Sequence, residues 1–162
     1  MIELVTVIVV LGIIAVTTMG PTLSYLDSMR NRAASARIVS DIRYMQRLAL
    51  SSGLRTWVTF NVAGNSYQLY MENRNNLGKA NRIAVTDPMY QSTSAITFGT
   101  SPFVNVTIGS ASIGSTAEIE FDGWGAPYNG SGVALSTTGT ISLSSGVSVT
   151  IQPVSGCAER AG

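Results

Sequence analysis

The sequence predicts an α+β protein in which a long N-terminal helix packs on a small antiparallel β-rich head. Two observations carry this prediction. The first 52 residues have helical periodicity, apolar in the first half and amphipathic in the second. After Gly53 the hydrophobic period shortens to two, and short apolar runs alternate with turns rich in Gly, Ser and Asn. We therefore expect three parts: a transmembrane or filament-core helix at 1–20, an amphipathic helix packing on the head at 21–52, and the head at 53–162.

The first twenty residues contain one charged side chain, Glu3, in an otherwise apolar run. As a helix they would be about 30 Å long, which is the thickness of a bilayer's hydrocarbon core. A secretory signal would have a basic start and a small-residue cleavage site, and neither is present. An ordinary membrane anchor explains the length but not Glu3, because a carboxylate in an apolar helix is costly and indicates a functional site.

Residues 2–15, IELVTVIVVLGIIA, resemble the mature N-terminal motif of type IV pilins and pseudopilins. In that family a prepilin peptidase cuts after a glycine, and a glutamate follows shortly after the N-methylated first residue. The resemblance implies that Glu3 pairs with the N-terminal ammonium of a neighbouring subunit, and such pairing offsets part of the desolvation cost. It also implies that Met1 stands two residues inside the mature terminus.

Gly20 and Pro21 end the apolar run. Proline removes a backbone donor and clashes with the preceding turn, so we expect a kink or a locally melted stretch there. The family typically carries a helix-bending proline nearby, and the resemblance gives this role in subunit assembly to Pro21.

From Thr22 to Ser52 two apolar stripes follow each other on the helix, rotated by roughly 140°. The first contains Tyr25, Leu26, Met29, Ala33 and Ala36, with Ser24, Asp27, Ser28, Asn31 and Ser35 opposite. The second contains Ile38, Ile42, Met45, Leu48 and Ala49. We expect the first stripe, with Tyr25 and Met29, to contact neighbouring helices in a filament, and the second to pack on the chain's own sheet. The alternative is a chance drift in a helix packed all round. Ser51-Ser52-Gly53 predicts the end of the helix.

The head is expected to form two antiparallel sheets or one curled sheet. The expected strands are 55–62, 67–71, 82–85, 95–98, 104–108, 117–121, 133–136, 140–143 and 147–151, the first two joined in a hairpin by the turn at 63–66. Glu118, Glu120 and Asp122 alternate along one strand. We expect them on its solvent side, and a cation site is the alternative reading.

Short matches in the head refine the resemblance. Segments 41–53, 119–123, 139–143 and 154–156 are similar in sequence and order to H-type pseudopilins of type II secretion and to FimT-like minor pilins. Residues 124–128 also resemble a loop of the major G-type pseudopilins. Between these subtypes the H-type and FimT-like heads are the more similar.

Charge is segregated along the chain. Residues 22–55 carry six arginines and two aspartates, whereas residues from 56 onward carry four basic and six acidic side chains. A basic helix and a mildly acidic head could attract each other between neighbouring subunits. A simple solvated basic face is the alternative.

The residue set does not favour an enzyme. Histidine is absent, and we find no nucleophile constellation, metal cluster or phosphate loop, so we expect no catalytic residue, cofactor or metal. One cysteine, Cys157, excludes an internal disulfide. We expect it to be a buried apolar filler, with a free thiol or an intermolecular link as alternatives.

The function expected from these observations is a structural subunit of a type IV pilus-like filament. Expected partners are copies of itself, other pilins or pseudopilins, prepilin peptidase, and the bacterial inner membrane before export to a surface pilus or periplasmic pseudopilus. The alternative is a minor pseudopilin of type II secretion, or a tip pilin whose head binds DNA or a secreted substrate. For such binding Arg74, Lys79 and Arg82, around the polar loop 73–81, are the best candidates. DNA is not expected, because the head is net acidic and phosphate neutralisation needs several basic groups.

Overall fold

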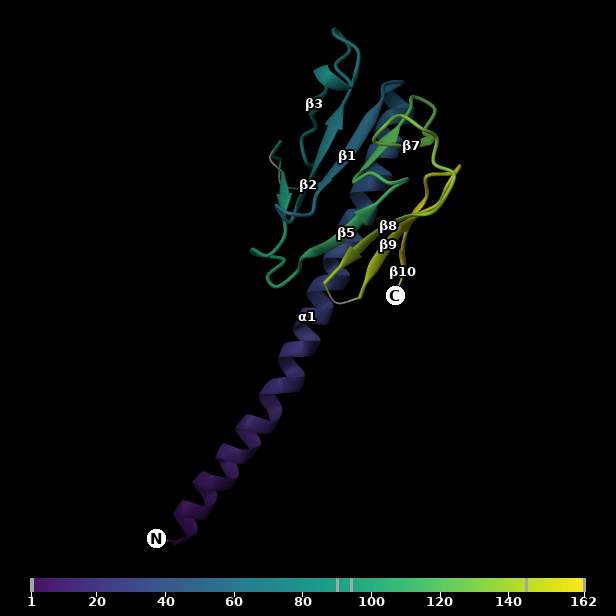
Figure 1. Ribbon diagram of the computed structural model, residues 1–162. Coiled ribbons are helices and arrows are strands. Elements are labelled where there is room, and N and C mark those ends of the chain that lie inside the picture. The colour runs from purple at the N-terminus through teal and green to yellow at the C-terminus, as the bar shows by residue number, and fades with distance from the viewer. Residues whose placement is uncertain (1, 90, 94, 145, 162) are drawn as a thin grey trace.

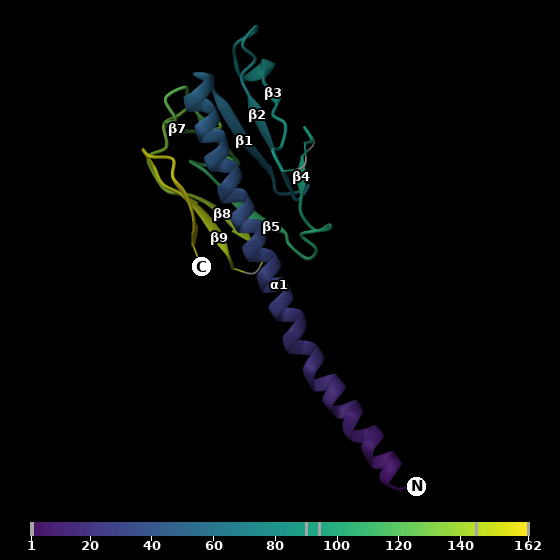
Figure 2. The ribbon, with the colours of Figure 1, turned by 180° about the vertical axis from the view of Figure 1, so that it is seen from behind.

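The computed structural model describes the backbone of residues 2–89, 91–93, 95–144 and 146–161, and their side chains except at 2 and 15–23. It has an α+β fold, with one long helix and two antiparallel sheets (Figure 1). The N-terminal half of the helix projects away from the head as an isolated rod. The other half lies along the sheets, as the view from behind shows (Figure 2).

Helix α1 (Ile2–Ser52) is continuous through Gly20 and Pro21, so of the predicted kink or melted stretch the melted alternative is wrong. A proline removes one hydrogen bond from a helix, and the turns on either side can retain the rest. The helix ends as predicted: Gly53 has φ 67°, and its N–H donates to the Ala49 carbonyl at 2.9 Å.

Within the described residues no helix is long and apolar enough to cross a membrane, and the side chains of residues 15–20 of the expected segment lie outside the described residues.

The head contains two antiparallel sheets, which is one of the two arrangements predicted, rather than one curled sheet. The first has the order β3-β2-β1-β6-β7, with β4 also paired to β2, and the second has the order β10-β9-β8-β5. The strands of the first sheet are β1 (Thr56–Asn61), β2 (Ser66–Met71), β3 (Ile83–Ala84), β4 (Ile96–Thr97), β6 (Glu118–Phe121) and β7 (Pro127–Asn129). Those of the second are β5 (Ile108–Ser112), β8 (Gly139–Leu143), β9 (Ser148–Ile151) and β10 (Ala158–Ala161). A short 3-10 helix, η1 (Lys79–Asn81), lies between β2 and β3.

The predicted β1–β2 hairpin forms, with Asn61 opposite Ser66. The strand expected at 104–108 is wrong, because a turn closed by the Phe103 carbonyl occupies this segment and β5 starts only at Ile108. The strand expected at 133–136 is reduced to one bridge, between Ala134 and Tyr128. Strands β7 and β10 were not predicted.

The core lies between the helix and the inner faces of the sheets, as expected for the second apolar stripe. Ile38, Ile42, Met45 and Ala49 are fully buried, and Leu48 is partly buried. Their partners include Val58, Phe60, Leu69, Ile119 and Phe121 from the first sheet and Ile141, Val149 and Ile151 from the second. Thr56 at the start of β1 also donates its hydroxyl to the Met45 carbonyl (3.0 Å), which ties the sheet to the helix backbone.

Candidate assembly surface

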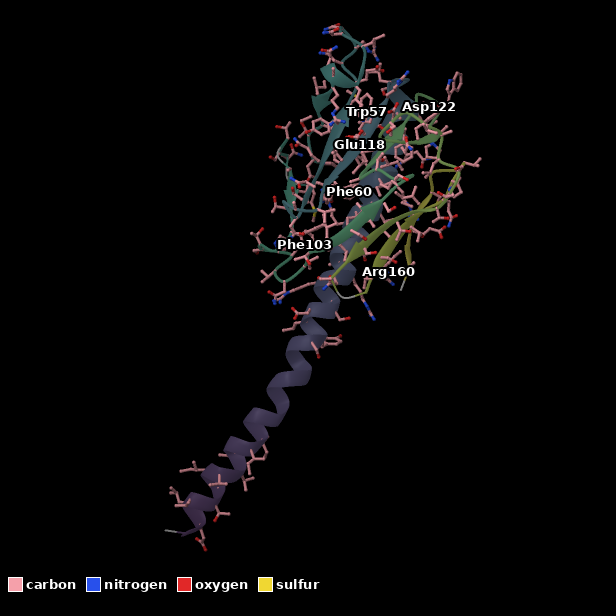
Figure 3. All side chains as sticks on the ribbon, viewed as in Figure 1. Trp57, Phe60, Phe103, Glu118, Asp122 and Arg160 are labelled. Carbon is pink, nitrogen blue, oxygen red and sulfur yellow. The ribbon has the colours of Figure 1, made fainter. Side chains whose placement is uncertain are left out.

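The projecting part of α1 carries a continuous exposed apolar surface. Between Glu3 and Ile14 every described side chain is exposed, and the only charged one is Glu3. Figure 3 shows these side chains extending from the helix at a distance from the head. The large apolar ones are Leu4, Val5, Val7, Ile8, Val9, Val10, Leu11, Ile13 and Ile14. A surface of this size and composition is typical of a contact with another apolar partner.

The first predicted stripe extends this surface toward the head. Tyr25, Leu26 and Met29 are exposed, and so are Ala33 and Ala36. This confirms the prediction that the first stripe faces away from the chain's own sheets. Whether it contacts neighbouring helices stays a prediction. The side chain of Pro21 lies outside the described residues.

The polar side opposite this stripe is buried where the head begins, which the sequence did not suggest. Asn31 accepts a hydrogen bond from the Ser144 hydroxyl (3.3 Å) and donates to the Asp27 carbonyl (2.9 Å). Ser35 is fully buried, and its hydroxyl donates to the Arg32 carbonyl (2.9 Å). These pairs satisfy the polar groups that the head covers.

A buried ion-pair network connects α1 to the head. Arg37 donates from Nε to Asp41 (2.9 Å) and from Nη2 to Asp87, and Tyr67 on β2 donates its hydroxyl to Asp41 (2.6 Å). Burial raises the pKa of Asp41, although Tyr67 and Arg37 act against it. Burial would lower the pKa of Arg37, but Asp87 and Asp41 together hold it above its ordinary value. Helix and head are thus held together by ion pairs within one chain, and attraction between neighbouring chains stays a prediction.

The candidate partner-binding residues are engaged within the head. Lys79 and Arg82 both pair with Glu118, the latter at 2.7 Å, and Arg82 also lies over the Tyr70 ring at 4.2 Å. Arg74 is exposed and donates to the Ser52 carbonyl (3.4 Å). Two of the three predicted cations therefore share the single carboxylate of Glu118.

The expectation that Glu118 and Glu120 face solvent is wrong. Both are buried, and Lys79 and Arg82 from the segment between β2 and β3 contact Glu118. The Glu120 carboxylate accepts hydrogen bonds from the indole N–H of the fully buried Trp57 (2.8 Å) and from the Arg55 guanidinium (3.4 Å). Figure 3 labels Trp57 and Glu118 in this region.

Opposing effects set the pKa of Glu118. Burial would raise it, but hydrogen bonds from Lys79, from the Thr59 hydroxyl (2.6 Å) and from Arg82 bring it below its ordinary value. Asp122, the third member of the alternating set, accepts instead from the Trp124 and Ala126 N–H groups, each at 2.9 Å. In the described part of the chain, no three His, Cys, Asp or Glu residues are grouped as a metal site would require.

Sequence reasoning missed a groove between α1 and β10. Arg43 and Arg47 line its helical side and Arg160 lines the strand side. Cys157 also lines the groove. Its thiol is free and half-buried, so the expected role of Cys157 as a buried filler is wrong. The signal was weak, because Ala-Glu-Arg-Ala lacks the apolar alternation that predicts a strand.

The chain matches no protein-family model, no curated protein and no solved structure.

Proposed function

We propose that the chain is a structural subunit of a type IV pilus-like filament, in which the projecting halves of α1 bundle and the heads lie outside. The observation that carries the proposal is the exposed apolar surface at residues 3–14, continued by Tyr25, Leu26 and Met29. The resemblance of residues 2–15 to the pilin motif supports the same function.

Burial of this surface supplies a large driving force for association. Covering one fully exposed Val, Leu or Ile side chain contributes about 1.5–3 kcal/mol. The nine large apolar residues of the projecting segment are each about half to two-thirds exposed, so burying a fraction of them would overcome the entropy of association. The backbone groups of an α-helix are hydrogen-bonded within the helix, so packing against neighbouring helices requires no new backbone hydrogen bonds.

Glu3 supplies specificity. Apolar packing alone allows helices to slide along one another, whereas one carboxylate in an apolar bundle must find a cation at a fixed height. A neighbour's N-terminal ammonium would fulfil this need, and a buried charge without its partner is strongly destabilising. The Glu3 pair would therefore set the axial register of the filament.

The test compares Glu3→Ala with Glu159→Ala, a control that removes another exposed carboxylate, from the head. Each full chain is purified in mild detergent, the detergent is removed, and the product is examined by electron microscopy. We expect uniform filaments from the parent chain and from Glu159→Ala, and only irregular aggregates from Glu3→Ala. Far-ultraviolet circular dichroism in detergent should be the same for all three. Uniform filaments from Glu3→Ala would contradict the proposed role of the carboxylate.

A further inference from the structure

The groove between α1 and β10 has a volume of about 800 Å³ and lies on the side of the head where Figure 3 labels Arg160. Its helical wall follows α1 from Ala36 to Arg47, a length of roughly 16 Å at the rise of an α-helix. An extended chain rises about 3.3 Å per residue, so about five residues of a strand fit along this wall.

The groove is positively charged. Arg43, Arg47 and Arg160 line it, and no carboxylate does. Among the described residues Arg47 and Arg160 have no ion-pair partner, and the only side-chain bond of Arg47 goes to the Arg43 carbonyl (3.2 Å). Glu159, beside Arg160 on β10, is exposed and contacts the Cys157 thiol at 3.8 Å. The arginine charges are thus available to an anionic ligand.

The free edge of β10 faces this groove. Strand β10 ends its sheet and pairs only with β9, where the Gln152 N–H donates to the Cys157 carbonyl (2.9 Å). Backbone groups alternate sides along an antiparallel strand, so those of Ala158 and Arg160 point away from β9. Arg43 donates to the Ala158 carbonyl (2.8 and 3.1 Å), which places that side toward the helix. Ala158 itself is fully buried beside the helix, so on this edge the N–H and carbonyl of the exposed Arg160 remain for a further strand.

We propose that this groove binds an extended acidic segment of a different protein, which adds as a strand to the free edge of β10. Strand addition gives main-chain hydrogen bonds, and side chains that alternate along the strand give specificity. Carboxylates on one face of the added segment would reach Arg43, Arg47 and Arg160. The inference does not depend on filament formation, because it uses the head and the packed half of α1 alone.

A second copy of this chain does not supply such a segment. Its carboxylates in the head are mostly committed: Asp87, Glu118 and Glu120 are buried in ion pairs, and Glu72 is buried against the Gly78 N–H (2.9 Å). In the whole sequence the closest approach to an acidic strand is Glu118-Ile119-Glu120, which is already the central strand β6. The complementary charge must therefore come from another protein.

The test uses the full chain in non-ionic detergent and fluorescence anisotropy of a labelled octapeptide in which Asp alternates with Val. We expect binding that weakens as salt concentration rises. The double variant Arg47→Gln/Arg160→Gln should bind about tenfold more weakly, since two charge pairs are lost. Arg32→Gln, which removes an exposed arginine of α1 outside the groove, should bind like the parent chain. Equal affinity of the double variant and the parent would overturn the site.

Three further comparisons test the ligand. A peptide with Asn in place of Asp should not bind, and equal binding would overturn the acidic character of the ligand. Peptides N-methylated on odd or on even amides test strand addition: one of the two should bind more weakly, and unchanged binding of both would overturn it. Tighter, Arg160-dependent binding of an oligothymidylate with the same charge would assign the groove to nucleic acid and overturn the proposal.

Discussion

The two halves of α1 are both rich in aliphatic side chains, yet their surroundings are opposite. Ile8 is 60% exposed and Ile42 is 0% exposed, although both lie in one uninterrupted helix. The buried half also contains polar and charged residues, including Asn31, Arg37 and Asp41, each of which has a partner. In the projecting half, the described side chains between Glu3 and Ile14 are more apolar and are all exposed.

This contrast shows that apolar content alone does not define the core of the chain. The segment with the more hydrophobic composition is the one left exposed, while a mixed segment is buried because the head supplies a partner for each group. An exposed apolar helix requires a second molecule or an apolar phase to cover it. The three predictions that follow test this difference, beginning with the largest effect.

Arg37→Leu should strongly destabilise the packed half. The substitution leaves Asp41 and Asp87 buried without their cation, and breaking a buried pair in this way costs about 3–5 kcal/mol. Denaturant unfolding of the detergent-dispersed chain, followed by tryptophan fluorescence, measures the effect. Arg32→Leu, at an exposed arginine with no ion pair among the described residues, should change the free energy of unfolding by less than about 0.5 kcal/mol. Equal losses for both variants would contradict the assigned network.

Ile42→Ala and Ile8→Ala make the same chemical change in the two halves. At position 42 the lost contacts and the resulting cavity should lower the free energy of unfolding by about 2–5 kcal/mol. At position 8 the head should be unaffected, within about 0.5 kcal/mol. The same denaturant titration measures both, and a loss at position 8 as large as that at position 42 would show that the projecting half is part of the folded core.

Glu118→Gln should alter the pH dependence of stability of the head. The folded-state pKa of Glu118 lies below its ordinary value of 4.5, so the carboxylate stabilises the fold above that pH. This contribution is lost as the pH falls through the folded-state pKa. The variant should be less stable than the parent chain at pH 7 but should lose less stability below pH 4.5. Parallel stability curves for the two proteins between pH 7 and pH 3 would contradict the lowered pKa.

Local periodicity was sufficient to predict the α+β class, most strands and the division of the helix into two stripes. It failed where burial depends on a distant segment. Glu118 and Glu120 have the alternation of a solvent-facing strand, yet both are buried. Lys79 and Arg82, more than thirty residues away in sequence, come beside Glu118. Arg37 likewise resembles a surface cation until Asp87, fifty residues away in sequence, comes beside it.

The candidate sites divide in the same way. Exposure of Tyr25 and Met29 followed from the helical period, because a stripe rotated away from the sheet cannot contact it. The groove at Arg43, Arg47 and Arg160 was not predictable, since it joins two segments more than a hundred residues apart in sequence. Its strand, β10, is short and polar and is recognised only by its pairing with β9.

The central claim is that other subunits cover the exposed stripe of α1. Its most direct test is thiol labelling of Met29→Cys before and after assembly, with Cys157→Ser as the background. Asn75→Cys, at an exposed position in the loop after β2, serves as the control. We predict that both cysteines react in the dispersed chain, and that in filaments the cysteine at 29 is protected while that at 75 still reacts. Equal reactivity of the two positions in filaments would contradict the account.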